Sequence, residues 1–468
     1  MALEGYASSQ LAIRRAPGAK FSYTDMLQTG KRCRSRKHTM RVDVYRSRHQ
    51  RNLEVKMLKG ATKTRVHVTA ALAALWLTAC GGGGGDDPAA PPVGQGPSAP
   101  APAPGAPAPA PGAPAPAPAT GLSWSATGPE DVWHSLSSSD DGQVMVAGQA
   151  QAGNFDESAL SVSSDGGQTW SNVASVGPGI WIASDVSGDG NRIVAVTLGG
   201  SMVMSNDRGV SFSSVALPGG ATPAFEGVTL SQDGSRIAAA SMDGPVFVGT
   251  VAGDGTVTWG APTGLPASAS WRAIDSSADG QVMVAVAQGP SAGNPAAAPA
   301  VYISTNGGQA WAPLVVAVGS PATPVTNQNW YRVKVSGDGN TIVLAANAYA
   351  GGSGDGIYVS KDRGQTFVRA HELVADYSSI AMSFDGGVIA VTHSTNPPAT
   401  ANGAVLLSTN GGTTFSPMTV SVDGTPVTEI NWRAITMASD ATRMAVAAGR
   451  FGDSSAGRIY VSSGSRPQ

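Results

Sequence analysis

Cysteine is nearly absent from this 468-residue chain, which contains only Cys33 and Cys80. Both precede the repeats described below, so the folded part needs neither a disulfide nor a thiol. Histidine is also rare, with six residues, and none of those in the repeats lies in a cluster with metal-ligand spacing. Neither a phosphate-binding glycine loop nor a Gly-x-Ser-x-Gly nucleophile motif can be read. We therefore expect no metal and no cofactor.

Charged residues are scarce as well, at 13%, and the net charge is −2. Residues 1–56 nevertheless contain 13 Lys and Arg against four Asp and Glu, whereas the chain from Cys80 onward contains 14 against 28. An acidic body lacks the clustered cations that neutralise phosphates, so we expect no nucleic-acid partner. The basic residues 32–51 have two interpretations, a nucleic-acid-binding arm or part of a non-native or disordered extension. We favour the extension for residues 1–56, with Met57 as the alternative start to Met1.

Long apolar runs are missing, and the apolar residues 66–77 are too few to span a bilayer as a stable helix. They follow Lys59, Lys63 and Arg65, an order typical of a secretory signal peptide. The run ends in Leu-Thr-Ala-Cys at residues 77–80, which resembles the lipobox of bacterial lipoproteins. The resemblance implies that residues 57–80 are a signal peptide and that Cys80 is lipidated. The alternative is an ordinary signal peptide with a coincidental cysteine.

A lipid-anchored protein of this kind would lie in the bacterial cell envelope. Several acyl chains on Cys80 would anchor it stably. Lipoproteins retained at the inner membrane commonly have Asp after the cysteine, and Gly81 stands there instead, which favours the outer membrane on its periplasmic or surface side. Residues 81–120 consist almost wholly of Gly, Ala and Pro. Alternating proline favours an extended spacer, so we expect a disordered tether with no packed structure before about residue 121.

A unit of roughly fifty residues recurs seven times in the remaining chain. In each copy an aromatic residue stands nine positions before the second residue of an Asp-Gly turn, or of Asp-Ala in the last copy. Asp-Gly between two apolar strands is a hairpin signal, because Gly accepts positive φ. The seven aromatic residues are Trp133, Trp181, Phe225, Trp271, Trp330, Tyr377 and Trp432.

A second signature, Ser-x-Asp/Asn-x-Gly-x-Thr-Trp/Phe with small variations, follows the third predicted strand of five units. It resembles the Asp box, or BNR repeat, of sialidase-like β-propellers. The resemblance implies structural turns in which the short acidic or amide side chain bonds nearby backbone N–H groups. The residues at this position are Asp165, Asp207, Asn306, Asp362 and Asn410. The third unit is degenerate.

Four short strands in each unit predict a propeller blade, so we expect an all-β, seven-bladed β-propeller over residues 121–468. The seventh unit lacks a fourth strand, and residues 122–126 form a spare one at the other end of the repeats. We predict that this N-terminal strand completes the last blade and closes the ring. We expect a monomer.

Candidate binding residues lie where the first strand of each unit begins, on the face that carries the long 2–3 loops such as 287–300 and 393–403. The aromatic residues either pack between blades, the interpretation we favour, or form a stacking platform. Arg332 and Lys334 are expected to line the channel opposite Asp185 and Asp275, most simply as ion-paired or solvated groups. The candidates are Trp133, His134, Trp271, Arg272, Trp330, Tyr331, Arg332, Tyr377, Trp432 and Arg433.

The function that we infer from these patterns is a non-enzymatic binding or assembly scaffold, with an envelope protein or a glycan as partner. Propellers resembling photosystem II assembly factors act in this way, but this is an analogy of fold alone. The alternatives are a sialidase-like glycoside hydrolase and a glycan-binding lectin. The sialidase family uses six blades and an Arg-Ile-Pro motif, which this chain lacks, so we assign no catalytic residue. Three Arg with Tyr and Glu at one mouth of the channel would favour the hydrolase.

Overall fold

The computed structural model describes residues 42–46, 53–59, 62–68, 121–150, 158–288, 300–325, 328–347, 356–373, 375–394, 403–428, 431–449 and 456–468. The chain divides into two compact units, residues 1–114 and 115–468.

The first unit contains a small antiparallel sheet in the order β1-β2-β3. Its strands are β1 (Val42–Arg46), β2 (Leu53–Lys59) and β3 (Thr62–Val68). This sheet differs from the expectation that no structure precedes about residue 121. Lipidation at Cys80 and a tether over residues 81–120 fall outside the described residues and stay predictions.

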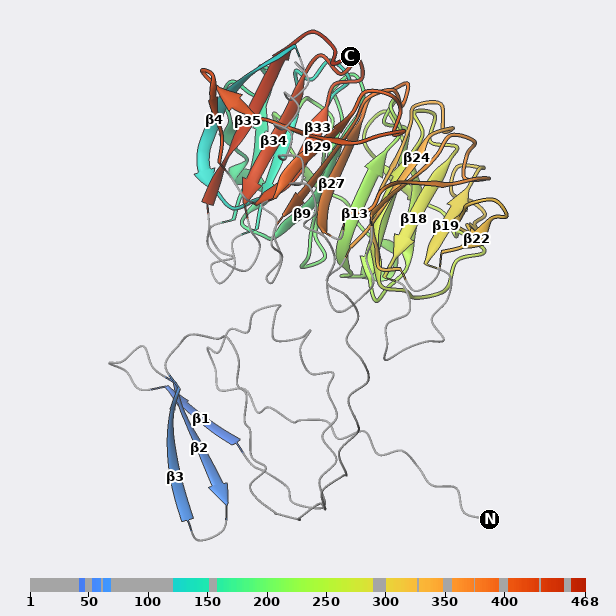
Figure 1. Cartoon of the computed structure of the whole chain (residues 1–468). Coiled ribbons are helices and arrows are strands. Elements are labelled where there is room, and N and C mark those ends of the chain that lie inside the picture. Colours follow the sequence, from blue (N-terminus) through green and yellow to red (C-terminus); the bar gives the residue numbers. More distant parts are fainter. Residues whose placement is uncertain are drawn as a thin grey trace, which may run out of the picture. The chain divides into compact units, whose positions relative to one another are not determined.

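The second unit is an all-β, seven-bladed propeller, as the repeats predict (Figure 1). Each blade is an antiparallel sheet of four strands in chain order, except the last. The innermost strands are β5 (Trp133–Ser138), β9 (Trp181–Val186), β13 (Ala224–Leu230), β17 (Trp271–Ser276), β23 (Trp330–Val335), β27 (Asp376–Met382) and β33 (Trp432–Met437). The second strands are β6 (Met145–Gln149), β10 (Ile193–Thr197), β14 (Arg236–Met242), β18 (Met283–Ala287), β24 (Ile342–Ala346), β28 (Ile389–Ser394) and β34 (Met444–Gly449).

The outer half of each blade is shorter. The third strands are β7 (Leu160–Ser163), β11 (Met202–Ser205), β15 (Val246–Val251), β19 (Val301–Ser304), β25 (Gly356–Ser360), β29 (Ala404–Ser408) and β35 (Ala456–Gly464). The fourth strands of blades one to six are β8 (Ser171–Asn172), β12 (Ser213–Ser214), β16 (Val257–Trp259), β20 (Ala312–Pro313), β26 (Val368–His371) and β30 (Ser416–Met418). Two small hairpins precede blades five and seven: β21 (Ala317–Val318) with β22 (Thr323–Pro324), and β31 (Ser421–Val422) with β32 (Thr425–Pro426).

The fourth strand of blade seven comes from the other end of the repeats, which confirms the predicted closure. β4 (Leu122–Asp131) pairs antiparallel with β35, so that Trp124 lies opposite Ser462 and Leu122 opposite Gly464. β31 adds one parallel pairing on the far side of β4. Pairing β4 in this way removes an open sheet edge and ties the two ends of the ring together.

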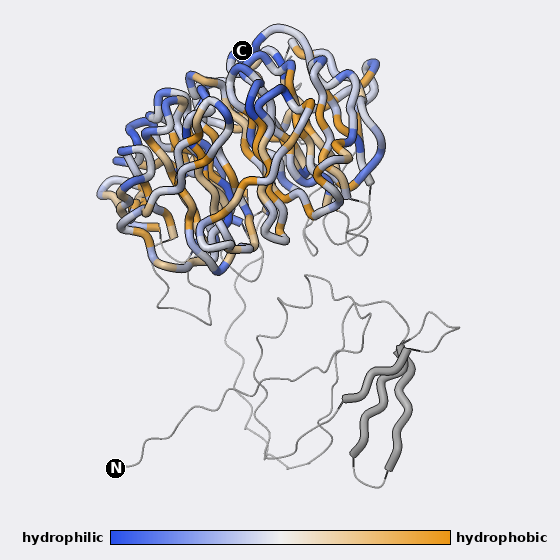
Figure 2. Tube along the Cα trace, turned by 180° about the vertical axis from the view of Figure 1, so that it is seen from behind, coloured by the Kyte–Doolittle hydropathy of each residue, from blue (hydrophilic) through white to orange (hydrophobic). Residues whose placement is uncertain are grey.

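Apolar side chains fill the space between neighbouring blades. The second strands are buried along almost their whole length, because each blade packs against another blade on both faces. Hydrophobic residues accordingly concentrate along the strands of the ring (Figure 2). Fully burying a large apolar side chain contributes roughly 1.5–3 kcal/mol, so these layers hold the blades together. Among the described residues, the only helical turns are Ala174–Val176 and Pro218–Gly220, and none is long and apolar enough to span a membrane.

The predicted Asp-Gly turns have one repeated geometry. A serine two residues before the Asp donates to its carboxylate at 2.6–2.7 Å and accepts the N–H of the residue three positions after the Asp. The Gly has positive φ in six blades, and Ala441 adopts φ 61° in the seventh. The Asp-box-like turns bond to these turns, as in the N–H of Gly166 donating to Gln143. Both kinds of turn therefore lie on one face, which we call the turn end; the 2–3 loops lie at the loop end.

A closed ring of backbone hydrogen bonds joins the seven blades at the turn end. In each blade, the residue immediately before the turn Asp donates its N–H to the matching carbonyl of the next blade, at N···O distances of 2.7–3.0 Å. The donors in order are Asp140, Gly188, Gln232, Ala278, Gly337, Phe384 and Ser439, and the last donates to Asp140. Because only backbone groups form these bonds, the ring requires no common residue type at this position, and sequence patterns alone do not reveal it.

Candidate functional site

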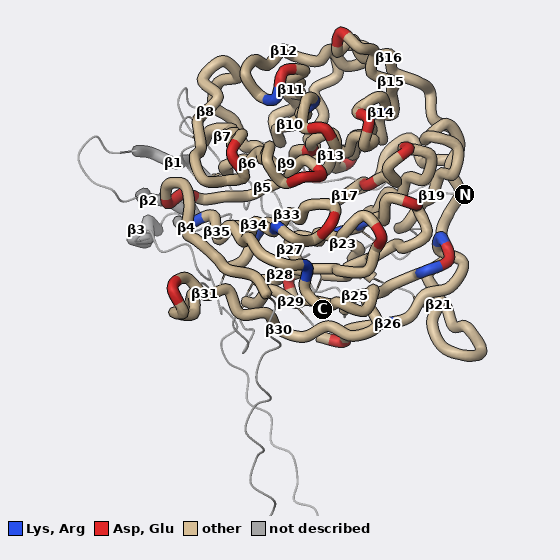
Figure 3. Tube along the Cα trace, turned by 90° about the horizontal axis from the view of Figure 1, so that it is seen from above, with Lys and Arg blue, Asp and Glu red and all other residues tan. Residues whose placement is uncertain are grey.

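A cavity of about 270 Å³ runs along the axis of the ring, lined by residues from the innermost strands of all seven blades. These strands surround the centre in Figure 3. Each begins at the loop end with its aromatic residue and finishes at the turn end with the Asp-Gly turn. A residue's position along the innermost strand therefore gives its depth in the cavity.

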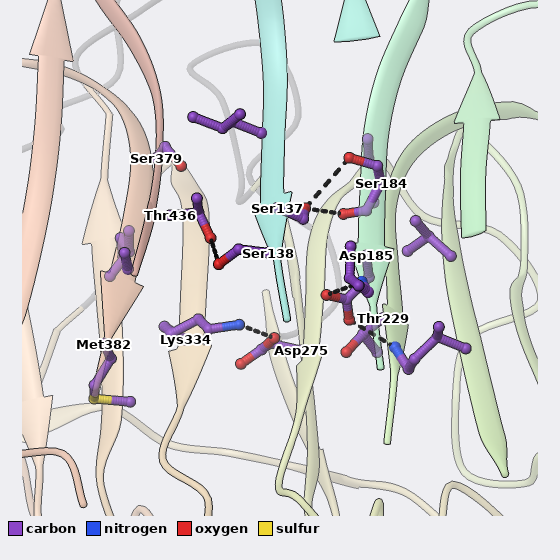
Figure 4. Close-up of a pocket in the computed structure, with 18 of the residues that line it drawn as sticks. Ser137, Ser138, Ser184, Asp185, Thr229, Asp275, Lys334, Ser379, Met382 and Thr436 are labelled. Atoms are coloured by element: carbon purple, nitrogen blue, oxygen red, sulfur yellow. Dashed lines mark hydrogen bonds and ion pairs between the residues drawn. The ribbon is translucent and has the colours of Figure 1, made fainter. Parts of the chain in front are cut away.

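Charged side chains from three blades meet halfway along the cavity (Figure 4). Lys334 Nζ donates to Asp275 Oδ1 at 2.8 Å, and the other carboxylate oxygen of Asp275 accepts the Val335 N–H at 2.6 Å. Asp185 makes the equivalent contact between blades two and three, where its Oδ2 accepts the Leu230 N–H at 2.7 Å. Each aspartate thus binds the backbone of the following blade.

Burial shifts the pKa of the two aspartates and the pKa of Lys334 in opposite directions. Burial raises the pKa of Asp185 and Asp275, although the charge of Lys334 works in the other direction. Burial alone would lower the pKa of Lys334, but the two aspartates raise it above its usual value. Lys334 therefore stays charged and balances one of the two carboxylates.

Hydroxyl groups line the rest of the same level and link neighbouring blades. Ser137 donates to the Ser184 carbonyl at 2.6 Å, and Ser138 lies 2.8 Å from the Thr436 hydroxyl. The Thr229 hydroxyl is 3.3 Å from that of Ser276. The wall of the cavity therefore presents more polar than apolar surface.

At the loop end, one residue of every innermost strand lies in a β-bulge directly after the aromatic residue. A bulge leaves the extra residue out of the ladder and redirects its side chain. The seven bulge residues are His134, Ile182, Glu226, Arg272, Tyr331, Ser378 and Arg433. Four predicted site residues are among them, and sequence reasoning recognised only that this position varies in kind.

Arg272, Arg332 and Tyr331 form a stacked group at this end. The guanidinium carbons of Arg332 and Arg272 lie 4.1 and 5.9 Å from the centre of the Tyr331 ring. Arg272 also pairs with buried Glu226 at 3.3 Å and donates to Gln288 Oε1 at 2.6 Å. Burial raises the pKa of Glu226, while the arginines, Arg272 most strongly, oppose that shift.

Arg433 and His134 meet on the other side of the mouth. Arg433 Nη2 lies 2.5 Å from His134 Nε2, and His134 Nδ1 lies 3.1 Å from the Ile182 carbonyl. Burial lowers the pKa of His134 well below its usual value, and the charges of Arg433 and Arg332 lower it further. A neutral His134 that donates from Nδ1 and accepts from Arg433 at Nε2 satisfies both contacts. The positive charge of Arg433 is left uncompensated by this partner.

Arg332 reaches the same mouth from one level deeper. Its Nε donates to the Ser378 carbonyl at 2.5 Å, and its Nη1 donates to the Tyr331 carbonyl at 3.0 Å and reaches that of Arg272 at 3.5 Å. Burial lowers the pKa of Arg332, with a smaller contribution in the same direction from Arg433. Two cations from blades five and seven therefore influence each other across the mouth.

The predicted aromatic residues are not part of this polar surface. All seven are at most 4% exposed and pack in the cores between blades; Trp271, for example, lies edge-on to Tyr302 at 5.6 Å. A stacking platform needs exposed ring faces, so Trp133, Trp271, Trp330, Tyr377 and Trp432 fit the packing interpretation instead. The polar candidates are the ones that the structure brings together. Most of each long 2–3 loop lies outside the described residues.

The five Asp-box-like turns share one bonding pattern. In the first, Asp165 Oδ1 accepts from Ser163 Oγ at 2.8 Å and from the Thr169 N–H at 2.9 Å. Asp207, Asn306, Asp362 and Asn410 repeat these two contacts. Partial desolvation alone would raise the pKa of Asp165, but hydrogen bonds from Thr169 and Ser163 lower it to about 2. All the partners are local, so the turns stabilise the blades and lie away from the loop end.

Residues that form the backbone ring also line the turn end of the cavity with their side chains. Gln232 donates a hydrogen bond to Asp140 Oδ2. Both side chains lie against Gly188, where an added Cβ would collide with them. The Phe384 ring similarly occupies the space that a Cβ on Gly337 would need. Sequence reasoning missed Asp140, Gln232 and Phe384, because their position in the repeat shows no common residue type. Among the described residues, no group of three or more His, Cys, Asp or Glu is arranged to hold a metal ion.

Comparisons with known proteins agree on the fold. No protein-family model and no curated protein matches the chain. A solved structure of U3-55K is similar over 74% of this chain and 99% of its own, with 11% identity and a TM-score of 0.51. A structure described as YCF48 bound to D1 peptide matches 75% of this chain and 99% of its own, with 15% identity and a TM-score of 0.49. The β-propeller domain of Myceliophteria thermophila Cps50 (Swd1) matches 73% and 99%, with 10% identity and a TM-score of 0.49. At these identities the likeness is one of fold: this chain is similar to seven-bladed β-propellers.

Proposed function

We propose that this propeller is a non-enzymatic binding scaffold of the bacterial cell envelope, anchored by lipid at Cys80, and that an anionic group of a partner protein binds at its loop end. The observation that carries the proposal is the meeting of Arg272, Arg332 and Arg433 around one mouth. Only Glu226 is ion-paired with any of them among the described residues.

Arginines in such a place suit the recognition of carboxylates. A guanidinium group offers several N–H donors in a fixed fork and forms charge-assisted hydrogen bonds that are about twice as strong as neutral ones. The backbone contacts of Arg332 fix its position before a ligand arrives, which reduces the entropy lost on binding. A rigid ring that presents cations at one mouth is therefore suited to hold an acidic partner.

The anchor is the second part of the proposal and depends on the sequence of residues 57–80 alone. A lipid at Cys80 followed by a Pro-rich spacer would hold the ring at a distance from the membrane and leave the loop end accessible. Labelling with a radioactive fatty acid tests this part directly. Label should enter the wild-type protein and be absent from Cys80→Ala.

The binding role is tested by affinity capture from solubilised envelopes, using the full chain as bait. Arg332→Gln combined with Arg433→Gln should abolish capture of a partner that the wild-type chain retains, since both cations are removed while side-chain length is nearly kept. Arg458→Gln is the matched control, because Arg458 pairs with Glu130 on the outer strands, away from the mouth. Capture that is unchanged by the double variant, or equally lost in the control, would count against this site.

A sialidase-like hydrolase is the second candidate, and the same cluster favours it, because three Arg, Tyr331 and Glu226 share one mouth. Two observations weigh on the other side. The Tyr331 ring is covered by guanidinium groups, and Glu226 is paired with Arg272 rather than with the tyrosine hydroxyl among the described contacts. Release of sialic acid by the wild-type chain, and its loss in Glu226→Gln, would replace the scaffold proposal. A lectin role would need exposed aromatic rings, and the seven aromatic residues at the start of the innermost strands are buried.

A further inference from the structure

The charges along the axial cavity change sign with depth. At the loop end, no carboxylate of the described residues is within ion-pair distance of Arg332 or Arg433, so the innermost strands contribute more positive than negative charge to the mouth. Halfway down, Lys334 is ion-paired with Asp275, and Asp185 remains as a second carboxylate. At the turn end, Asp140 accepts a hydrogen bond from the neutral side chain of Gln232. The deeper part of the cavity is therefore negative.

Asp185 has unused capacity to bind a ligand. It is partly exposed to the cavity that it lines, and its two oxygens accept the N–H groups of Val186 and Leu230 at 2.9 and 2.7 Å. A carboxylate can accept about four hydrogen bonds, so room for further donors remains. No Lys or Arg of the described residues is within ion-pair distance of it. A partly buried carboxylate in this state is a ready partner for a cation.

We infer that the axial cavity binds a dipolar ligand: its carboxylate lies against Arg332 and Arg433 at the loop end, and its ammonium or guanidinium group pairs with Asp185. The chemical class is a basic amino acid, either free or as the C-terminal residue of a partner protein. This inference rests on the proposed function, since it uses the same mouth, and it adds the deeper half of the recognition.

The spacing of the two ends fits such a ligand. Asp185 and Lys334 both stand four residues after the aromatic residue of their strands, and Arg332 stands two residues after its own. A strand rises about 3.3 Å per residue, so the two levels are roughly 7 Å apart. The four-carbon stem of a lysine carries its ammonium group a comparable distance from its carboxylate. An amino acid with a short side chain does not span both levels.

Titration calorimetry with the full chain tests the inference with four probes: free lysine, Gly-Gly-Lys, Gly-Gly-Lys amide and Gly-Gly-norleucine. Gly-Gly-Lys should bind about tenfold or more tightly than the amide, which lacks the carboxylate, and than the norleucine peptide, which lacks the ammonium group. Free lysine that binds as well as Gly-Gly-Lys would identify a small-molecule ligand. A clear preference for the tripeptide would identify a chain end.

Two variants separate the ends of the site. Asp185→Asn keeps the shape of the side chain and an oxygen that can accept from Leu230, and it should abolish the preference for lysine over norleucine. Arg332→Gln should abolish the preference for the free carboxylate over the amide. Asp423→Asn removes the same charge from the turn between β31 and β32 and should leave both preferences intact.

Equal affinity for the lysine and norleucine peptides, or an Asp185→Asn variant that keeps the preference, would overturn the inference. So would the absence of binding by all four probes. If these results were accompanied by loss of partner capture in the Arg332/Arg433 double variant, the scaffold role would stand while the ligand class was wrong. Intact capture in that double variant would instead remove the proposed function.

Discussion

The two ends of the propeller are built from the same seven strands but by different means. At the turn end, six of the seven blades repeat a serine-aspartate-glycine turn, and every blade contributes one N–H to a closed backbone ring. At the loop end, each blade contributes a bulge residue, and these residues differ in charge, size and aromaticity. Regular backbone bonding at one end fixes the positions of the strands, so that the other end can vary its side chains without loss of the fold.

The comparison also shows why the bulge position at the loop end tolerates charged residues. The backbone ring and the cores between blades define the width of the cavity, while Arg272, Tyr331 and Arg433 stand outside the strand ladder. A charged side chain here is stabilised by stacking and by ion pairing, as in Arg272, which lies 5.9 Å from the centre of the Tyr331 ring and pairs with Glu226. Stability and recognition are therefore separated along the axis of each innermost strand.

The largest effect should come from removing one aromatic residue that fixes the loop end of a strand. Trp271→Ala deletes a fully buried side chain and should lower the free energy of unfolding by about 3–5 kcal/mol. Thermal or urea denaturation of the full chain measures it. A loss below about 1 kcal/mol would show that Trp271 is not a packing residue, and would reopen the stacking-platform interpretation.

A smaller effect on stability is expected halfway along the cavity, between the turn end and the loop end. Lys334→Met leaves the buried Asp275 without its cation and should lower the free energy of unfolding by about 1–3 kcal/mol; Lys334 itself is partly exposed to the cavity. Adding Asp275→Asn should restore much of the loss, because no unpaired charge then remains. A double variant as unstable as the single one would contradict the role of charge pairing here.

The smallest effect belongs to the Asp-box-like turns, which are exposed. Asp165→Ala should cost about 1 kcal/mol through lost turn hydrogen bonds. The folded-state pKa of Asp165, about 2, lies below its unfolded value of 3.8. The stabilisation is therefore present above about pH 4 and is lost as the pH falls toward 2. The difference in stability between wild type and variant, measured by denaturation at several pH values, should shrink over this range; a constant difference would mean that the carboxylate charge is not involved.

The fold could be predicted from the sequence because the turns are formed by residues close together in the chain. The Asp-Gly hairpin signal recurs at a constant distance from an aromatic residue, which gave the number of blades. The spare strand predicted at residues 122–126 gave the place of closure, and in the structure it extends to Asp131. Burial of the aromatic residues followed from the same reasoning, since large rings at repeated strand positions have to pack somewhere. Candidate residues such as His134, Arg272 and Arg433 were named for their variation, without their partners being known.

Residue types and spacings thus determined the seven-bladed architecture, the bonding of its turns and which face varies, since each depends on contacts within a few residues of chain. Only the tertiary structure decided that Arg272, Arg332 and Arg433 share one mouth, that Lys334 pairs with Asp275 rather than Asp185, and that a ring of seven backbone hydrogen bonds closes around the axis. These contacts join residues up to 299 positions apart, as in His134 with Arg433. They depend on bulges, blade number and ring closure, which set distances across the axis that no local pattern encodes.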